Sequence, residues 1–247
     1  MNTQTVQQLL ELNRQFYQRF SHEFSQTRQR LQPGVRRILQ DQPPGLAYLD
    51  LGCGNGETWR WLASQAAPRR YVGLDFSPGL LEAANQGQVS QAVTPEFYLV
   101  NLAASDWEHD LPAAAFDRVL AFAVLHHLPG QALRLQILSG VRRLLVPGGE
   151  LLLSNWQFIN SPRLAERLLP WSAAGLEAAC VDGGDFLLDW RSGGSGLRYV
   201  HLYSEAELAD LAEKSGFSVR ESFYSDGHGG RLGLYQRWYN PLQVCAS

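Results

Sequence analysis

Apolar side chains recur every three to four positions between residues 5 and 20 of the chain. This spacing predicts an amphipathic helix, although Asn13 stands where another apolar side chain is expected. Pro33 can open a second helix with apolar residues on its buried face, and the run Pro43-Pro44-Gly45 ends it. The chain is therefore predicted to begin with two helices.

After residue 45 the pattern changes to short apolar runs that alternate with helical spacing. These runs are the predicted strands: LAYLDL (46–51), YVGLD (71–75), EFYLV (96–100), FDRVLAFAV (116–124) and ELLLSNW (150–156). Helices are predicted between them, around 58–65, from Pro78 with Ser77 as the N-cap, and over 131–145. Short apolar strands separated by helices predict a parallel sheet covered on both faces.

Residues 157–200 interrupt this rhythm with clusters of Trp, Gly and Asp, which indicate an insertion. A helix over 204–214 and two strands, 217–224 and 231–238, are predicted to close the fold. The 247 residues contain no repeat and no linker long enough to divide them, so we expect one α/β domain.

Composition excludes several classes of protein. The net charge is −3, so no global basic field attracts nucleic acid. The 3 cysteines are odd in number and form no paired motif, which favours a reducing compartment. The first residues lack a cationic stretch followed by an apolar block, and no apolar run approaches the roughly 18 residues of a membrane span. We therefore expect a cytoplasmic protein.

The most informative motif follows the first predicted strand and reads Leu49-Asp50-Leu51-Gly52-Cys53-Gly54-Asn55-Gly56. Its alternating glycines permit a tight turn and a close approach of the backbone to a ligand. Glu57 stands where a dinucleotide fingerprint needs glycine, and the absence of a following Lys-Ser/Thr pair excludes a P-loop. An acid at the strand end suits a cationic amino-acid moiety. The candidate binding residues of this loop are Asp50, Gly52, Cys53, Gly54 and Gly56, with Cys53 interpreted as a small residue and not a nucleophile.

The ends of the next three strands offer further contacts, because ligands of open α/β sheets lie outside the carboxyl ends of the strands. Asp75 ends the second strand, where an acid can bond ribose hydroxyls, and Phe76 can stack on an adenine face. Asn101-Leu102 follows the third strand, where an adenine amine could be read. Ala121-Phe122 lies near the end of the fourth strand and completes the candidate set.

Together the motifs DLGCGNG, GLD, FDRVLAFAVLHHL and LLVPGGELLL resemble the class I S-adenosylmethionine-dependent methyltransferases. The resemblance covers residues 46 to about 155, and the elements from 204 to 238 fit the closing part of that family. It implies a Rossmann-like, seven-stranded, mostly parallel sheet with an antiparallel last strand. It also implies S-adenosyl-L-methionine as the cofactor, S-adenosyl-L-homocysteine as its product, and no metal. Asn101 departs from the family, since many members have Asp there; an Asn carbonyl can still bond the adenine amine.

The resemblance also implies that different segments of the chain bind the cofactor and the acceptor. The segments expected are an N-terminal helical cap (1–42), a cofactor-binding core (46–156), a substrate-side insertion (157–203) and closing elements (204–247). Methyl transfer from a sulfonium is an in-line displacement, in which the enzyme mainly supplies proximity and orientation. The identity of the acceptor should therefore be decided in the cap and the insertion.

Three runs are similar to one subfamily, the tRNA wobble-uridine carboxymethyl methyltransferases, and the first two of them lie outside the cofactor motifs. These runs are Phe24-Ser25-Gln26-Thr27-Arg28, then Gly184-Asp185 with Trp190 and Arg198-Tyr199-Val200-His201, and Val124-Leu125-His126-His127. The subfamily esterifies a carboxymethyl group on a modified uridine. A carboxylate acceptor is already ionised and needs cationic or hydrogen-bonding groups to hold it in line, without a strong general base. The residues that this resemblance assigns to the acceptor are Arg28, His126, His127, Arg198 and His201.

Alternatives remain open at the sequence level. Arg28 can be a surface charge, one of His126 and His127 can cap the following helix, and Tyr199 suits a core as well as a site. The acceptor is either tRNA or a small-molecule carboxylate or hydroxyl compound, and the resemblance also raises an activating protein partner. A non-catalytic, methyltransferase-like scaffold would show a decayed cofactor loop, whereas this loop is intact. A nicotinamide oxidoreductase is excluded by Glu57 and by the lack of a Tyr-x-x-x-Lys motif.

Overall fold

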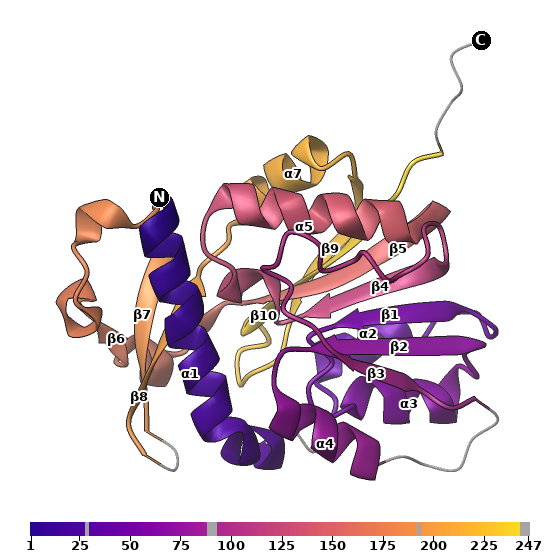
Figure 1. Ribbon diagram of the computed structural model, residues 1–247, viewed down its shortest axis with the longest axis horizontal. Coiled ribbons are helices and arrows are strands. Elements are labelled where there is room, and N and C mark those ends of the chain that lie inside the picture. Colours follow the sequence, from indigo (N-terminus) through magenta and orange to yellow (C-terminus); the bar gives the residue numbers. More distant parts are fainter. Residues whose placement is uncertain (28–29, 88–92, 192–193, 243–247) are drawn as a thin grey trace.

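A sheet of seven strands runs through the middle of the computed structural model, which describes residues 1–27, 30–87, 93–191 and 194–242 (Figure 1). The strand order is β3-β2-β1-β4-β5-β10-β9. β1 to β5 pair in parallel, while the last strand of the chain, β10, runs antiparallel to both of its neighbours. The strands are β1 (Ala47–Leu51), β2 (Arg70–Asp75), β3 (Glu96–Leu99), β4 (Phe116–Phe122), β5 (Leu145–Trp156), β9 (Ser218–Ser225) and β10 (Gly233–Tyr239). The predicted fold class is confirmed.

Helices cover both faces of this sheet, because alternate side chains of the buried strands point to opposite sides. In β1, Leu49 and Leu51 join the core beneath α5 and α7, whereas Tyr48 joins the core beneath α2 and α3. The helices that pack on the sheet are α2 (Pro33–Leu39), α3 (Glu57–Gln65), α4 (Pro78–Gln86), α5 (Gln131–Leu144) and α7 (Glu205–Lys214). Both cores are thus continuous with the parallel strands that carry the glycine loop.

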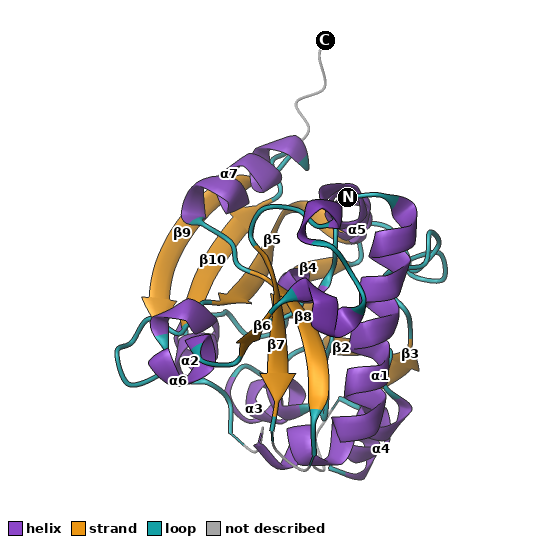
Figure 2. Cartoon of the chain, turned by 90° about the vertical axis from the view of Figure 1, so that its left-hand side faces the viewer, coloured by secondary structure: helices purple, strands orange, loops and turns teal. Residues whose placement is uncertain are grey.

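The insertion folds into a small sheet of its own, in the order β6-β7-β8. Its strands are β6 (Leu168–Leu169), β7 (Asp185–Trp190) and β8 (Gly196–His201), preceded and accompanied by α6 (Pro162–Ala165) and short 3₁₀ turns at Phe158–Asn160, Trp171–Ala174 and Ala178–Cys180. Figures 1 and 2 show this small sheet beside the N-terminal helix, α1 (Thr3–Thr27), on one side of the molecule. The N-terminal cap and the insertion, which are far apart in the sequence, therefore lie side by side in the structure.

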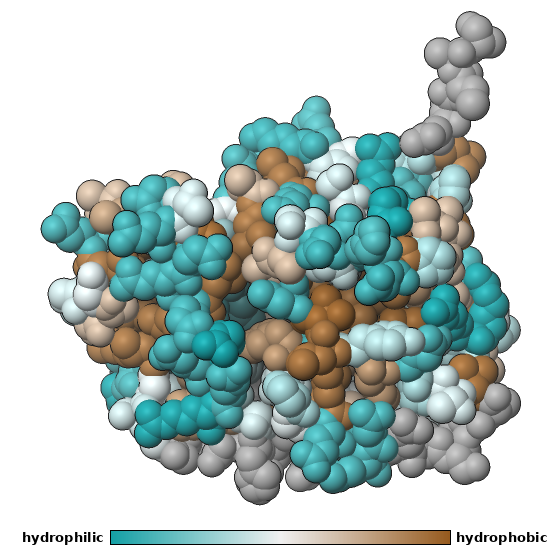
Figure 3. Space-filling view, in the orientation of Figure 1, coloured by the Kyte–Doolittle hydropathy of each residue, from teal (hydrophilic) through white to brown (hydrophobic). Residues whose placement is uncertain are grey.

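Helix α1 is amphipathic, as its spacing predicts, and it is longer than predicted, with a kink at Phe20. Its outer surface is hydrophilic (Figure 3). Its inner face buries Phe16, Tyr17 and Phe20, which pack against Phe76 of the core and Trp190 of β7. One helix face thus contacts both the glycine-loop side of the molecule and the insertion.

Three local expectations need correction. β5 begins at Leu145, so the Pro147-Gly148-Gly149 run lies within the strand and does not precede it. Ser77 occupies the N-cap of α4, but its side chain makes no capping hydrogen bond; its backbone N–H instead donates to Asp75 Oδ1 at 2.9 Å. Strand β3 is less buried than its apolar run predicts, since Leu99 is 61% exposed.

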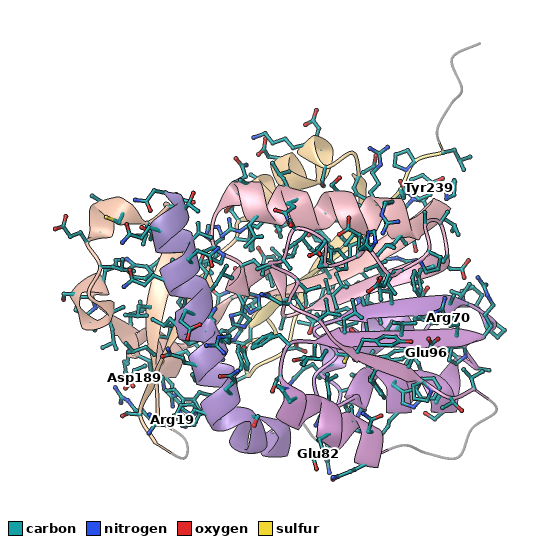
Figure 4. The ribbon with its side chains drawn as sticks, viewed as in Figure 1. Arg19, Arg70, Glu82, Glu96, Asp189 and Tyr239 are labelled. Carbon is teal, nitrogen blue, oxygen red and sulfur yellow. The ribbon has the colours of Figure 1, made fainter. Side chains whose placement is uncertain are left out.

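Strand β3 forms one edge of the sheet and is tied to β2 by an ion pair. Arg70 Nε lies 2.9 Å from Glu96 Oε1, and Figure 4 shows the two side chains together near the amino ends of their strands. This contact lies at the opposite end of the strands from Asp75, so it steadies the edge without entering the region where a ligand is expected.

Candidate active site

A cavity of about 1160 Å³ lies at the carboxyl ends of the parallel strands, between the central sheet and the α1–β8 side of the molecule. Residues of β1, β2, β4 and β5 form its floor, and residues of α1, β7 and β8 line the opposite wall. Open α/β sheets bind ligands at this end of the strands. The volume exceeds that of a typical single-ligand pocket, which leaves room for two reactants.

The glycine loop lies in the floor of this cavity with its backbone open to it. Gly52 and Gly54 both have positive φ angles, +65° and +56°, which favour glycine. A Cβ on Gly52 would meet Val124 at 2.8 Å, whereas nothing lies within 4 Å of a Cβ on Gly54. The space over Gly54 is therefore free for a ligand that approaches the main chain.

Two buried carboxyls flank the loop. Asp50 is 2% exposed and accepts a hydrogen bond from the Tyr71 hydroxyl at 2.5 Å. Burial raises the pKa of Asp50 to about 7, against the opposing effect of that hydrogen bond. Asp75 accepts hydrogen bonds from Gly54 N and Ser77 N at 2.9 Å each, and burial still raises its pKa. Carboxyls that are buried this deeply are stabilised as anions by a ligand that brings positive charge or hydroxyl donors.

The remaining predicted cofactor contacts divide into two groups. Those that line the cavity are Asp50, Gly52, Cys53, Gly54, Asp75, Phe76, Asn101, Leu102 and Phe122. Gly56 does not line it: this glycine is the N-cap of α3 and lies against α4, where a Cβ would meet the Cβ of Ala84 at 3.1 Å. Ala121 also lies outside the lining, because its side chain is 1% exposed within the core below the sheet surface. Gly56 and Ala121 therefore shape the site without facing it.

Asn101 and Phe76 sit on the side of the cavity formed by β2 and β3. The side-chain oxygen of Asn101 accepts a hydrogen bond from Ala103 N at 3.0 Å, so part of its acceptor capacity is used by the local turn. Phe76 packs edge-to-face with Tyr17, with ring centroids 5.7 Å apart. An aromatic ring and an amide at adjacent strand ends suit the stacking and reading of a planar heterocycle.

The two adjacent histidines, His126 and His127, both line the cavity. Trp156 N lies 3.3 Å from His126 Nδ1, and since a backbone N–H can only donate, His126 Nδ1 is an acceptor. His127 Nδ1 lies 3.3 Å from the Tyr199 carbonyl and His127 Nε2 lies 2.8 Å from the Tyr17 hydroxyl. The carbonyl requires a proton on Nδ1 of a neutral His127, so its Nε2 accepts from Tyr17.

Arg198 lines the same wall and is 8% exposed. Its guanidinium carbon lies 4.5 Å from the ring centroid of Trp156, 5.2 Å from that of Phe16 and 5.8 Å from that of Trp190. Aromatic faces stabilise a partly desolvated cation and hold its planar fork in one orientation. A forked cation held in this way is suited to a carboxylate or a phosphate.

His201 is not brought to the cavity. The residue is 1% exposed, and its ring nitrogens contact Asp185 Oδ1 at 2.6 Å and Glu207 Oε1 at 2.7 Å. Burial lowers the pKa of His201, but these two carboxylate partners outweigh it and the pKa is raised. His201 therefore links β8 to β7 and α7, and the sequence resemblance placed it too close to the chemistry. Arg28 lies outside the part of the chain that the structure describes.

Asn13 and Asn155 were missed as site residues. Asn13 is 5% exposed and binds the backbone of both Tyr199 and His127. Its signal was present in the sequence, since a polar residue on the apolar face of a helix needs a buried partner. Asn155 follows the apolar part of β5 and lines the cavity. Its only signal was an amide at the end of a buried strand.

Within the described ranges, no group of three or more His, Cys, Asp and Glu side chains is arranged to hold a metal ion. No helix in the same ranges is long and apolar enough to cross a membrane. Among the residues that line the cavity, Asp50 and Asp75 lie at the ends of β1 and β2, and Arg198 lies on the opposite wall.

Comparison with known proteins agrees with this architecture. A family model described as a methyltransferase domain matches residues 49–153. A putative methyltransferase of Encephalitozoon cuniculi is 33% identical, with 83% of this chain and 86% of that protein covered. A tRNA (carboxymethyluridine(34)-5-O)-methyltransferase of Schizosaccharomyces pombe is 28% identical, with 85% of this chain and 90% of that protein covered.

Solved structures show the same fold at lower sequence identity. A SAM-dependent methyltransferase of Methanosarcina mazei superimposes with a TM-score of 0.64 at 22% identity, over 87% of this chain and 100% of that chain. A complex from Haloferax volcanii, between the Trm112 methyltransferase activator and a putative methyltransferase, matches with a TM-score of 0.64 at 14% identity, over 91% of this chain and 96% of that chain. The chain thus belongs to the methyltransferase family. It is a methyltransferase, as its sequence motifs predict.

Proposed function

We propose that this protein methylates a carboxylate oxygen, and that the carboxylate belongs to the carboxymethyl group of a modified uridine at the tRNA wobble position. The observation that carries the proposal is the aromatic enclosure of Arg198 in the cavity wall that faces the glycine loop. The similarity to a methyltransferase named for carboxymethyluridine supports the same acceptor.

The cofactor side of the cavity fits S-adenosylmethionine. Asp50 and Asp75 are buried acids with raised pKa values, and they suit a cationic ammonium group and ribose hydroxyls respectively. The open backbone at Gly54 admits the amino-acid moiety, and Phe76 offers a face to the adenine. We therefore assign these four residues to cofactor binding, with Asn101 and Leu102 at the adenine edge.

When bound, S-adenosylmethionine supplies an electrophilic methyl group whose carbon–sulfur bond breaks as the acceptor oxygen bonds to carbon, leaving a thioether and a methyl ester. An ionised carboxylate has its lone pair available, so no proton has to be removed and no general base is required. Arg198 can hold one carboxylate oxygen by charge-assisted hydrogen bonds while the other oxygen points at the methyl group. The Nε2–H of a neutral His126 provides a second donor in the same wall.

The Tyr17–His127 pair connects the two halves of the site. Tyr17 packs on Phe76, on the cofactor side, and donates to His127, on the acceptor side. Neither group needs to exchange a proton with a carboxylate acceptor. We assign the pair to orientation, since each member fixes the other's rotamer.

The proposal is tested by transfer of a tritiated methyl group to bulk tRNA and to a small-metabolite extract in parallel. Base-labile label in tRNA, as expected of a methyl ester, supports the proposal. Label only in small molecules would instead establish the small-molecule carboxylate or hydroxyl acceptor, and label in tRNA that resists base would exclude an ester.

The Arg198→Lys variant tests whether the planar guanidinium group of Arg198 matters, and not its positive charge alone. Arg198→Lys keeps the positive charge but removes the planar fork, and we expect kcat/KM for the acceptor to fall about tenfold or more. Cofactor affinity should stay within about twofold. Arg163→Lys, at an exposed position on α6, is the matched control. Equal activity of the two variants would remove Arg198 from the acceptor site.

An activating protein partner is part of the same proposal. The matching Haloferax volcanii protein was solved in complex with an activator, and β3 offers an exposed sheet edge with Tyr98 and Leu99 uncovered. Addition of an activator of that type to the purified chain should raise methyl transfer and protect β3 from hydrogen exchange. Unchanged turnover together with unchanged exchange would remove this partner from the proposal.

A further inference from the structure

The amide of Asn155 is buried in the wall of the cavity without a hydrogen-bond partner for either polar atom among the described residues. The residue is 1% exposed. A buried amide that makes no hydrogen bond is destabilising, so native proteins keep one where a ligand or a water completes it. Both Nδ2, the donor, and Oδ1, the acceptor, of Asn155 therefore need a ligand or water as a hydrogen-bond partner.

The neighbours of Asn155 in β5 already have partners. Ser154 Oγ accepts from Ala123 N at 3.1 Å. Trp156 N contacts His126 Nδ1 at 3.3 Å, and the Trp156 ring lies under the Arg198 guanidinium. Asn155 therefore lies next in sequence to Trp156, which contacts both groups assigned to the acceptor, His126 and Arg198.

The chemistry of an amide restricts what can satisfy it. Nδ2 donates and Oδ1 accepts, side by side, so the complementary ligand edge presents an acceptor beside a donor. A carboxylate offers acceptors only and would leave Oδ1 unpaired. The imide edge of a uracil ring offers N3–H next to a carbonyl oxygen, and enzymes that act on a base read this edge by hydrogen bonds.

We propose that Asn155 recognises the imide edge of the acceptor's uracil ring, with Oδ1 accepting from N3–H and Nδ2 donating to the adjacent carbonyl oxygen. This inference rests on the proposed function and adds to it a residue that reads the base, whereas Arg198 holds the carboxylate. The two contacts together would fix the ring and its carboxymethyl arm, which is what an in-line transfer requires.

The test uses an anticodon stem-loop RNA with 5-carboxymethyluridine at the wobble position and the same RNA methylated at N3 of that base. N3 methylation removes the donor and adds bulk, so wild-type kcat/KM should fall about a hundredfold or more. Asn155→Leu, which has a similar size, should lose about tenfold or more on the first RNA. If the Asn155 amide contacts N3–H of the base, the free-energy losses from the substitution and from N3 methylation are not additive. N3 methylation should then lower kcat/KM far less for Asn155→Leu than for wild type.

Asn160→Leu is the matched control, because Asn160 is exposed and lies outside the cavity lining. Cofactor affinity, measured by calorimetry, reports whether each variant is folded. Asn155→Asp keeps an acceptor but loses the donor, and a partial loss is expected of it. Should Asn155→Leu fail to fold, the wild-type comparison of the two RNAs and the Asp variant still decide the question.

The outcomes are distinct. Equal methylation of both RNAs by wild type would overturn the role of Asn155 and leave the proposed function standing. Independent, multiplicative penalties would also overturn it and indicate that the amide binds only a structural water. If wild type methylates neither RNA while it methylates another acceptor, the proposed function fails and this inference fails with it.

Discussion

The side chain of Asn13 pairs with the main chain of Tyr199 as a neighbouring strand would. Asn13 Oδ1 accepts from Tyr199 N at 2.9 Å, and Asn13 Nδ2 donates to Tyr199 O at 3.1 Å. Nδ2 also lies 3.1 Å from the carbonyl oxygen of His127. One buried amide thus fastens α1 to β8 and to the turn that carries the two histidines.

Asn13→Ala should destabilise the protein, because it leaves buried backbone groups of Tyr199 and His127 unpaired. We expect the free energy of unfolding to fall by about 2–3 kcal/mol. Urea unfolding measures this difference, with Gln15→Ala on the exposed face of α1 as the control. The control should change stability by less than about 0.5 kcal/mol. Similar losses in the two variants would show that the Asn13 contacts contribute little.

Tyr17→Phe should impair turnover more than cofactor binding. The substitution keeps the ring that packs on Phe76 but removes the hydroxyl that His127 Nε2 accepts from. The loss of one such hydrogen bond corresponds to a fall in kcat/KM of about five- to tenfold. Tyr98→Phe, on the exposed edge strand, is the control. The orientation role of Tyr17 is wrong if steady-state kinetics are the same for wild type and both variants.

Cofactor affinity should depend on the charge of Asp50. Its pKa is about 7, so the carboxyl becomes the anion that attracts an ammonium group as the pH rises through about 7. The affinity for S-adenosylmethionine, measured by calorimetry, should rise over this range in wild type and less in Asp50→Asn. The ammonium of the ligand titrates in both proteins alike, so the difference between them reports Asp50.

Glu82→Gln, an exposed position on α4 (Figure 4), controls for a change in net charge and should follow wild type. Parallel pH profiles for wild type and Asp50→Asn would remove Asp50 from the cofactor site.

His201 should make stability fall as the pH rises. Its pKa in the folded protein is raised above the usual value of about 6.5 by Asp185 and Glu207, so the folded state holds the proton more tightly than the unfolded state. The stabilisation is fully present below about pH 6.5 and is lost as the pH passes the folded pKa. The difference in melting temperature between wild type and His201→Gln should therefore shrink with increasing pH. A constant difference would mean that the pKa of His201 is the same in the folded and the unfolded protein.

The regular part of the fold was predictable because each signal is local. The strand runs, the glycine loop and the helix over 131–145 are each determined by residues close together in the sequence, and all of them occur in the structure. The floor of the cavity could be predicted for the same reason. Parallel strands place their carboxyl ends at one edge, so Asp50 and Asp75 had to be neighbours.

The acceptor side could not be predicted in the same way, because it depends on contacts between distant segments. His201 follows Arg198 by three residues in the same strand, yet only Arg198 lines the cavity. Side chains three apart in a strand point to opposite faces, so β8 turns His201 away from the cavity, toward Asp185 of β7 and Glu207 of α7. Likewise, nothing near Asn13 in the sequence indicates that its partner is 186 residues away.

The Asn13–Tyr199 pairing has a consequence for how such enzymes acquire new acceptors. The N-terminal helix and the insertion form one surface although the whole cofactor core separates them in the chain. An exchange of the insertion alone would leave Asn13 facing a foreign strand, whose register would have to offer an N–H and a carbonyl at the same place. We therefore expect the two segments to be inherited as a pair, and chimeras that transplant both to remain folded where single transplants do not.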